Sequence, residues 1–349
     1  MLFGNALFLA SFMTHTKTWL QTHYQGIILT LLVTALGLFC AQLLDFSSVL
    51  VTLVIGILLN PIIDRPNIAN RVNPGLQFSL ELPLQIGTGL LGLKITDELL
   101  KLMSPTIIIL IIMGVLLTLG VSVLANRFIK WSSLEAALTG AGVAICGASA
   151  MMAMSLVLKK GRLRQESLIS LIMTVIGLSA IAMVLYPLIV KFLAFDDAMG
   201  GLIMGATIHQ VSQVVGAGAV FGPEGMAVAT MSKMLRVACL VPVMLIFITF
   251  YGKNEKATAT KMNPLAYMPK FLYFFILLAV ANVYGWVPEP IKPMLSTISN
   301  ILILLAVAAI AVKTNLRSLL TVGWKPVVLM TIDSLFLFIW IVGGVMLLT

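Results

Sequence analysis

Polar side chains lie within an otherwise apolar stretch, GATIHQVSQVVGAG, at residues 205–218. His209, Ser212 and Gln213 have the spacing i, i+3, i+4, so they share one face of a helix. Imidazole, hydroxyl and amide groups can all donate hydrogen bonds to an anion. Glycines, which each cost a helix interior about 1 kcal/mol relative to Ala, stand at both ends. The pattern predicts an interrupted helix with a polar face directed at a water-filled cavity, although a lone buried His is more often an ordinary core residue.

Two basic residues, Lys233 and Arg236, lie within another apolar stretch and share a helix face. A basic side chain at the centre of a bilayer costs about 2.5–3.5 kcal/mol on insertion scales. Because the Arg fork suits oxyanions, the pair predicts a cationic wall for an anion. The alternative is a helix that begins near Lys233 and lets both side chains reach the membrane surface. Lys94 and Lys313 would add positive charge if their helices end at the same cavity.

A second glycine-rich stretch, GAGVAICGASA, covers residues 140–150. It predicts another interrupted helix. Small residues also let membrane helices pack closely, and for the glycines alone this simpler explanation is favoured.

Two acidic residues, Glu81 and Asp333, lie inside predicted membrane segments. Acids in membranes often carry protons or pair with a buried base. Both residues are therefore candidates for ion coupling. A structural ion pair or an acid facing the protein interior explains them equally well.

The elements that must position these residues are membrane-crossing helices. The chain has 349 residues, of which 60% are hydrophobic and 10% charged, and its mean hydropathy is +1.08. A soluble domain carries about a quarter charged residues. Apolar runs long enough to span a bilayer predict an all-α polytopic protein with about 11 transmembrane helices, at residues 26–44, 47–62, 76–93, 105–125, 134–158, 166–195, 199–221, 226–251, 268–286, 294–312 and 326–348. Residues 1–25 are expected to form a peripheral or interfacial segment, and 26–349 a single transporter unit with interleaved core and scaffold helices.

Charge and composition exclude several classes of protein. The net charge of +9 is explained by Lys and Arg in cytoplasmic loops better than by nucleic-acid binding. The three cysteines lie in apolar segments and suggest neither disulfides nor a metal site. No zinc-protease, nucleophile-elbow or phosphate-loop motif occurs, so we expect no enzyme, metal or cofactor. An inside N-terminus satisfies the positive-inside tendency but places basic residues 159–164 outside, which leaves the orientation open.

Two stretches share a plan that suggests an internal repeat. LLGLKITDELLKLMSP, at residues 90–105, and AIAVKTNLRSLLTVGWKP, at residues 309–326, each have a Lys at a helix end, a Leu pair and a Pro before the next span. Transporters are often built from repeats with broken helices near the midplane. Lysines at helix ends are also common without any repeat.

The motifs LLGLKIT, AICGASAMMA, GATIHQVSQVV, KMLRVACLVPV and AVKTNLRSLL together resemble the YeiH family, whose members are proposed sulfate exporters. The resemblance implies a bacterial inner-membrane transporter with a fold similar to sodium/proton antiporters and bile-acid symporters, with crossing broken helices and inverted repeats. It marks, position by position, Lys94, Cys146, Gly147, Ser149, His209, Ser212, Gln213, Lys233, Arg236 and Lys313. The chain departs from the family at Gln210, where an acid is frequent, and at Lys94, where Arg is frequent.

These observations predict a secondary transporter that moves a small inorganic oxyanion, such as sulfate or sulfite, by alternating access. The expected partners are that anion, the lipid bilayer and a second copy in a homodimer. One alternative is a sodium- or proton-coupled symporter of organic acids or sulfonates, with a wider cavity. Another is a membrane sensor or assembly subunit that binds a ligand without transport.

Overall fold

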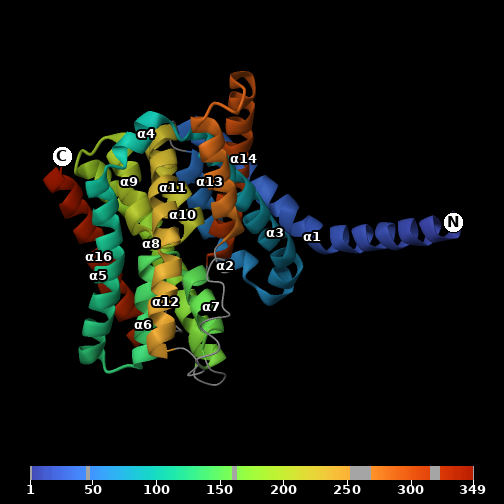
Figure 1. Cartoon of the computed structure of the whole chain (residues 1–349). Coiled ribbons are helices and arrows are strands. Elements are labelled where there is room, and N and C mark those ends of the chain that lie inside the picture. The colour runs from blue at the N-terminus through green and yellow to red at the C-terminus, as the bar shows by residue number, and fades with distance from the viewer. Residues whose placement is uncertain (1, 45–47, 159–162, 252–268, 315–322, 349) are drawn as a thin grey trace. The chain divides into compact units, whose positions relative to one another are not determined.

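The computed structural model describes residues 2–44, 48–158, 163–251, 269–314 and 323–348, and its elements are helices (Figure 1). Residues 159–162 of the basic loop, the hydrophilic connection at 252–264 and residues 315–322 of the second repeat copy lie outside the described residues. The α-helices are α1 (Leu2–Leu44), α2 (Ser48–Ile63), α3 (Pro66–Leu90), α4 (Asp97–Leu102), α5 (Pro105–Ile129), α6 (Ser133–Ala144), α7 (Ala148–Leu156), α8 (Gln165–Phe192), α9 (Asp197–Thr207), α10 (Val211–Gly218), α11 (Gly222–Ala238), α12 (Leu240–Tyr251), α13 (Lys270–Val283), α14 (Lys292–Lys313) and α16 (Trp324–Leu348). Short 3-10 helices are η1 (Leu91–Lys94), η2 (Ala219–Phe221) and η4 (Glu289–Ile291).

Six helical stretches of the described chain are long and apolar enough to cross a membrane. They are Gln21–Leu44, Pro105–Ile129, Gln165–Phe192, Val211–Tyr251, Glu289–Lys313 and Trp324–Leu348. These confirm an all-helical membrane protein, but they do not confirm the expected count of about 11. Helix α1 continues without a break from Leu2 to Leu44, so the interfacial position expected for residues 1–25 stays a prediction.

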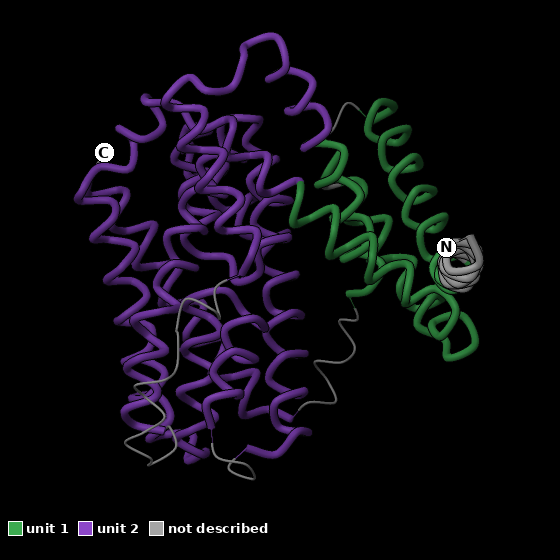
Figure 2. Tube along the Cα trace, turned by 45° about the vertical axis from the view of Figure 1, so that its right-hand side comes forward, with its two compact units in different colours: residues 1–86, 300–315 green, residues 87–299, 316–349 purple. Residues whose placement is uncertain are grey.

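The chain forms two compact units, each built from separate stretches of sequence (Figure 2). Unit 1 comprises residues 1–86 and 300–315, and unit 2 comprises residues 87–299 and 316–349. In unit 1 an apolar core joins α1, α3 and α14 through Val33, Val72, Leu76, Ala308, Ala309 and Val312. A Cβ at Gly26 would lie 2.1 Å from Val72 O, so glycine lets the backbones of α1 and α3 approach closely.

Unit 2 contains both predicted interruptions. Helices α5, α6 and α16 pack together, and α9 packs along α11. A Cβ at Gly201 would lie 2.2 Å from Gly225 O, and one at Gly205 would lie 2.1 Å from Ala229 O. Because small residues bring these two backbones into contact, the basic residues about one and two turns further along α11 face the end of α9.

The two stretches of the predicted repeat have corresponding features. Lys94 ends η1 and Lys313 ends α14. Beside each Lys, an Asn from another helix donates to a backbone carbonyl: Asn282 Nδ2 to Ile95 O at 2.9 Å, and Asn60 Nδ2 to Val312 O at 2.8 Å. The first pair lies in unit 2 and the second in unit 1. This similarity supports the prediction of an internal repeat.

Candidate functional site

Two helices of unit 2 are interrupted where the sequence predicts it. The first break separates α6, which ends at Ala144, from α7, which begins at Ala148; the second lies between α9 and α10, at residues 208–210. Gly147 has a φ of +66°, a conformation that glycine adopts without steric cost. A Cβ at Gly147 would lie 3.2 Å from Gln210 Cδ. The two breaks therefore lie against each other.

Lys233 of α11 reaches the breaks from a fully buried position, with 0% of its surface exposed. Its Nζ donates to Ile145 O at 2.7 Å, to Ile208 O at 2.9 Å and to His209 O at 2.5 Å. Three carbonyl acceptors require three N–H hydrogens, so the group is an ammonium. The sequence predicted that Lys233 faces an anion. In the structure, all three hydrogens of its ammonium group are directed at backbone oxygens instead.

Arg236, also 0% exposed, binds the same helix ends. Its Nε donates to Ala144 O at 2.8 Å and Nη2 to Val143 O at 2.6 Å, both at the end of α6. Its Nη1 donates to Gly205 O at 3.1 Å and Ile208 O at 2.9 Å, at the end of α9. The last carbonyls of a helix carry partial negative charge. Lys233 and Arg236 therefore neutralise the C-terminal ends of both interrupted helices.

The opposite ends of the breaks are helix starts without side-chain caps. The N-cap residue of α7 is Gly147 and that of α10 is Gln210, and neither makes a side-chain cap hydrogen bond. The first amides of a helix have no intrahelical acceptor and carry partial positive charge. The starts of α7 and α10 therefore offer donors suited to an anion.

The predicted polar face of α10 is buried at the same place. Ser212 is 4% exposed and Gln213 1% exposed. Gln213 Nε2 donates to Ile176 O at 3.4 Å, while Gln213 Oε1 has no hydrogen-bond partner among the described residues. In the other break, Ser149 Oγ donates to Cys146 O at 3.2 Å.

His209 is held by a residue of the last helix. Its ring is 0% exposed and its Nε2 lies 2.9 Å from Ser334 Oγ. The Ser334 hydroxyl donates to Met330 O at 2.5 Å. Since a hydroxyl has one hydrogen, His209 Nε2 is the donor to Ser334. Ser334 thus fixes the orientation of the imidazole beside the breaks.

The structure brings together most of the predicted site residues but not all. Unit 2 gathers at the breaks Cys146, Gly147, Ser149, His209, Ser212, Gln213, Lys233 and Arg236. Asp333 precedes Ser334 on α16, next to this cluster. Lys94 is half-buried at the end of η1, also in unit 2. Lys313 and Glu81 lie in unit 1, where Lys313 Nζ donates to Gln77 Oε1 and Gln77 Nε2 donates to Glu81 Oε1.

Several contributing residues were missed from the sequence. Ser179 accepts a hydrogen bond from Gln210 N at 3.1 Å, Tyr186 lies with its hydroxyl 3.5 Å from Ser334 O, and Ser334 binds His209. Ser179 and Tyr186 lie on α8 and Ser334 on α16, both largely apolar helices. Such Ser residues usually bond their own helix backbone, so nothing in the local sequence distinguishes those that bond another helix.

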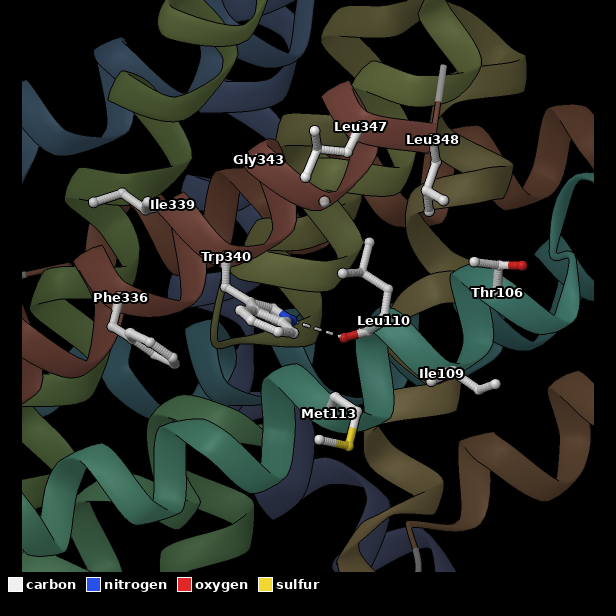
Figure 3. A pocket seen from close by; sticks show the side chains of 11 residues that line it. Thr106, Ile109, Leu110, Met113, Phe336, Ile339, Trp340, Gly343, Leu347 and Leu348 are labelled. Atoms are coloured by element: carbon white, nitrogen blue, oxygen red, sulfur yellow. Dashed lines mark hydrogen bonds between the residues drawn. The ribbon is translucent and has the colours of Figure 1, made fainter.

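A separate apolar pocket of about 630 Å³ lies between α5 and α16 (Figure 3). Met113, Phe336 and Trp340 contribute to its lining, and Trp340 Nε1 donates to Leu110 O at 3.0 Å. None of its lining residues is charged or belongs to the breaks. Such a surface suits a lipid chain better than an anion.

Fold and site together define a multi-pass helical membrane protein with two interrupted helices around buried basic residues. The chain belongs to the family described as "Conserved hypothetical protein 698", whose family model matches residues 25–330. It is 33% identical over 334 residues to the UPF0324 membrane protein TauZ of Paracoccus denitrificans, covering 96% of this chain and 98% of that protein. It is 28% identical over 350 residues to the UPF0324 inner membrane protein YeiH of Salmonella typhimurium, covering 94% and 96%.

A third relative is the UPF0324 membrane protein RB0971 of Rhizobium meliloti, 34% identical over 327 residues that cover 93% of each chain. These relatives confirm the predicted resemblance to YeiH and, with the six apolar helices, place the chain in the inner membrane. No solved structure matches the chain.

Proposed function

We propose that the chain is a secondary transporter, not an enzyme, that carries a small inorganic oxyanion such as sulfate or sulfite across the inner membrane. The observation that supports this is the asymmetry of the two breaks. Buried cations occupy the C-terminal ends of α6 and α9, while the starts of α7 and α10 have no side-chain cap. Interrupted helices with free starts near the midplane are typical of transporter anion sites.

The charges at the breaks favour an anion with two negative charges. Each helix terminus carries about half a unit charge, so the two C-terminal ends and the two N-terminal starts together contribute about zero. Lys233 and Arg236 then leave a net charge of about +2 in a region without solvent exposure. A dianion such as sulfate would balance this charge, with the backbone amides of the helix starts and Ser212 as its donors.

In this proposal Lys233 and Arg236 act through charge rather than direct contact, because their hydrogens are directed at carbonyls. His209 and Gln213 complete the lining, and Lys94 remains a proposed further source of positive charge, whereas the same role for Lys313, which belongs to unit 1, stays a prediction of the sequence. With no side chain larger than a methyl group at Gly147 and Ala148, the start of α7 suits a compact anion better than a large organic acid. Alternating access would follow from one group of helices moving against another around the site.

A thermal-shift screen of the purified chain with sulfate, sulfite, thiosulfate, small sulfonates and carboxylates tests the proposal. Sulfate or sulfite should raise the melting temperature in proportion to the logarithm of its concentration. The same anion should then cross the membrane of proteoliposomes that contain the protein. A response to organic acids alone would favour the organic-acid symporter, and binding without flux would favour a sensor.

A further inference from the structure

Asp333 is a buried acid in the middle of α16 without a visible partner. It is 0% exposed, and neither carboxylate oxygen has a hydrogen-bond partner among the described residues. The ion pairs of the described chain, Arg164 with Glu166 and Lys292 with Glu289, do not involve it. Burying an ionised carboxylate without a partner is strongly unfavourable, so the group is neutral in this arrangement.

The hydroxyl of Ser122 on α5 lies near the Asp333 carboxyl. That hydroxyl donates to Ala136 O at 2.8 Å. Since its single hydrogen is used there, Ser122 Oγ can offer Asp333 only a lone pair. A carboxylate would be repelled by that lone pair, whereas a protonated carboxyl can donate to it. The geometry therefore suits a carboxyl that carries a proton.

The helices packed against α16 are α5, α6, α8 and α9. The charged or titratable side chains of these helices are Arg127, Glu135, Glu166, Tyr186, Lys191 and Asp197, and His209 lies in the break after α9. None of them forms a hydrogen bond or ion pair with Asp333 among the described residues. A sodium ion would need several oxygen ligands, whereas a proton can bind the carboxylate alone. A proton fits this environment better.

Asp333 is next in sequence to Ser334, which contacts His209 of the second break. Ser334 Oγ binds His209 Nε2 at 2.9 Å, and the Tyr186 hydroxyl lies 3.5 Å from Ser334 O. Lys233, Arg236 and the four helix ends at the breaks together carry a net charge of about +2. A negative charge on Asp333 would lower it to about +1. An ionised Asp333 therefore weakens the binding of a dianion, and a neutral one strengthens it.

We propose that Asp333 is the proton carrier of this transporter and that the proton and the oxyanion cross together. The inference rests on the proposed function. A dianion bound at the starts of α7 and α10 stabilises the protonated carboxyl of Asp333, and the proton returns to solvent when the anion leaves on the other side. By linkage, the anion and the proton raise each other's affinity by the same factor.

The test uses the full-length protein in liposomes with radiolabelled sulfate outside and a pH-sensitive dye inside. A second measurement is the sulfate dissociation constant of purified protein between acidic and alkaline pH. With one linked proton, the wild-type affinity should fall by up to about tenfold per pH unit above the midpoint. Sulfate entry should acidify the liposome interior.

The variant Asp333→Asn keeps the shape of the neutral carboxyl but cannot exchange a proton. It should bind sulfate with less than about a twofold change across the same pH range, and sulfate should no longer carry protons. Ser122→Ala removes the lone pair that favours a protonated Asp333, so affinity at neutral pH should fall and recover on acidification. Glu166→Gln, at an exposed ion pair on α8, is the matched control and should behave as wild type.

Each outcome decides between the two proposals. Sulfate flux without proton movement, sodium dependence in place of proton dependence, or proton coupling that survives in Asp333→Asn overturns the assignment of Asp333 and leaves the transport function intact. Failure of the wild type to bind or move any inorganic oxyanion overturns the proposed function and with it this inference. If Asp333→Asn does not fold, the affinity of Ser122→Ala at two pH values gives the decision, because a packing defect would not be rescued by acid.

Discussion

Replacement of Lys233 by Met would remove the ammonium but keep the length and most of the volume of the side chain. Three carbonyl oxygens, of Ile145, Ile208 and His209, would lose their donor. A buried group left without its hydrogen bond costs about 1–3 kcal/mol, and breaking a buried charged arrangement costs about 3–5 kcal/mol in total. Three unpaired carbonyls would cost about 3–9 kcal/mol, and because the variant also avoids the cost of burying an ammonium, we take the lower part, about 3–5 kcal/mol, as the expected loss of stability.

The assay is thermal unfolding of the purified protein in detergent. For domains of 150–250 residues, 1 kcal/mol shifts Tm by about 2–4 °C. The shift is smaller in longer chains, so Tm should fall by about 3–10 °C. Lys101→Met, at an exposed position of α4, is the control and should leave Tm unchanged. A Lys233→Met protein with wild-type Tm but no sulfate response would refute the reasoning, because the ammonium would then contact the anion and not the helix ends.

Three further substitutions test how the site is positioned. Gly147→Ala forces a side chain into a conformation of φ +66° and should cost about 1–3 kcal/mol, measured as a lower Tm together with reduced sulfate flux. Ser334→Ala leaves the buried Nε2 of His209 without its partner and should weaken sulfate binding by about 5- to 150-fold, the equivalent of about 1–3 kcal/mol; an unchanged dissociation constant would show that His209 does not need this orientation. Gly205→Ala places a Cβ 2.1 Å from the α11 backbone and should lower Tm by several degrees, whereas Gly120→Ala, with open space around its Cβ, should not; equal melting of the two would contradict the close packing of α9 on α11.

The interruptions of the two helices could be predicted from the sequence because their cause is local. Gly147 supplies a backbone conformation that other residues adopt only with strain. Residues 205–218 combine glycines with a polar face that lipid would penalise. The family could be recognised as well, because its motifs occur in order along the chain.

The hydrogen-bond partners of the two basic residues could not be predicted. Lys233 bonds Ile145 across 88 positions, and Arg236 bonds Val143 across 93 positions. Which ends of the broken helices meet these side chains depends on the packing of α11 against α9 and α6, and side-chain spacing within one helix carries no information about it. Basic residues inside a span predict a compensating negative group, but they do not say whether that group is a ligand or a set of carbonyls.

Two other features depend on contacts between distant parts of the chain. Lys313 donates a hydrogen bond to Gln77, 236 positions away in the sequence, within unit 1. No sequence motif predicts this contact. The number of spans was also uncertain from hydropathy, since α3 contains Pro74 and Pro83 and a largely polar first half. Helices of this kind are recognised by packing rather than by apolar length.

The most direct test of the central claim is to locate an anion in the protein. Selenate has the shape and charge of sulfate, and its selenium can be identified by anomalous X-ray scattering from a crystal of the complex. Our account predicts a selenium peak within hydrogen-bonding distance of the amides that begin α7 and α10, with Lys233 and Arg236 still bonded to the carbonyls of α6 and α9. A peak bonded directly to the Lys233 ammonium, or a selenium site away from both breaks, would contradict it.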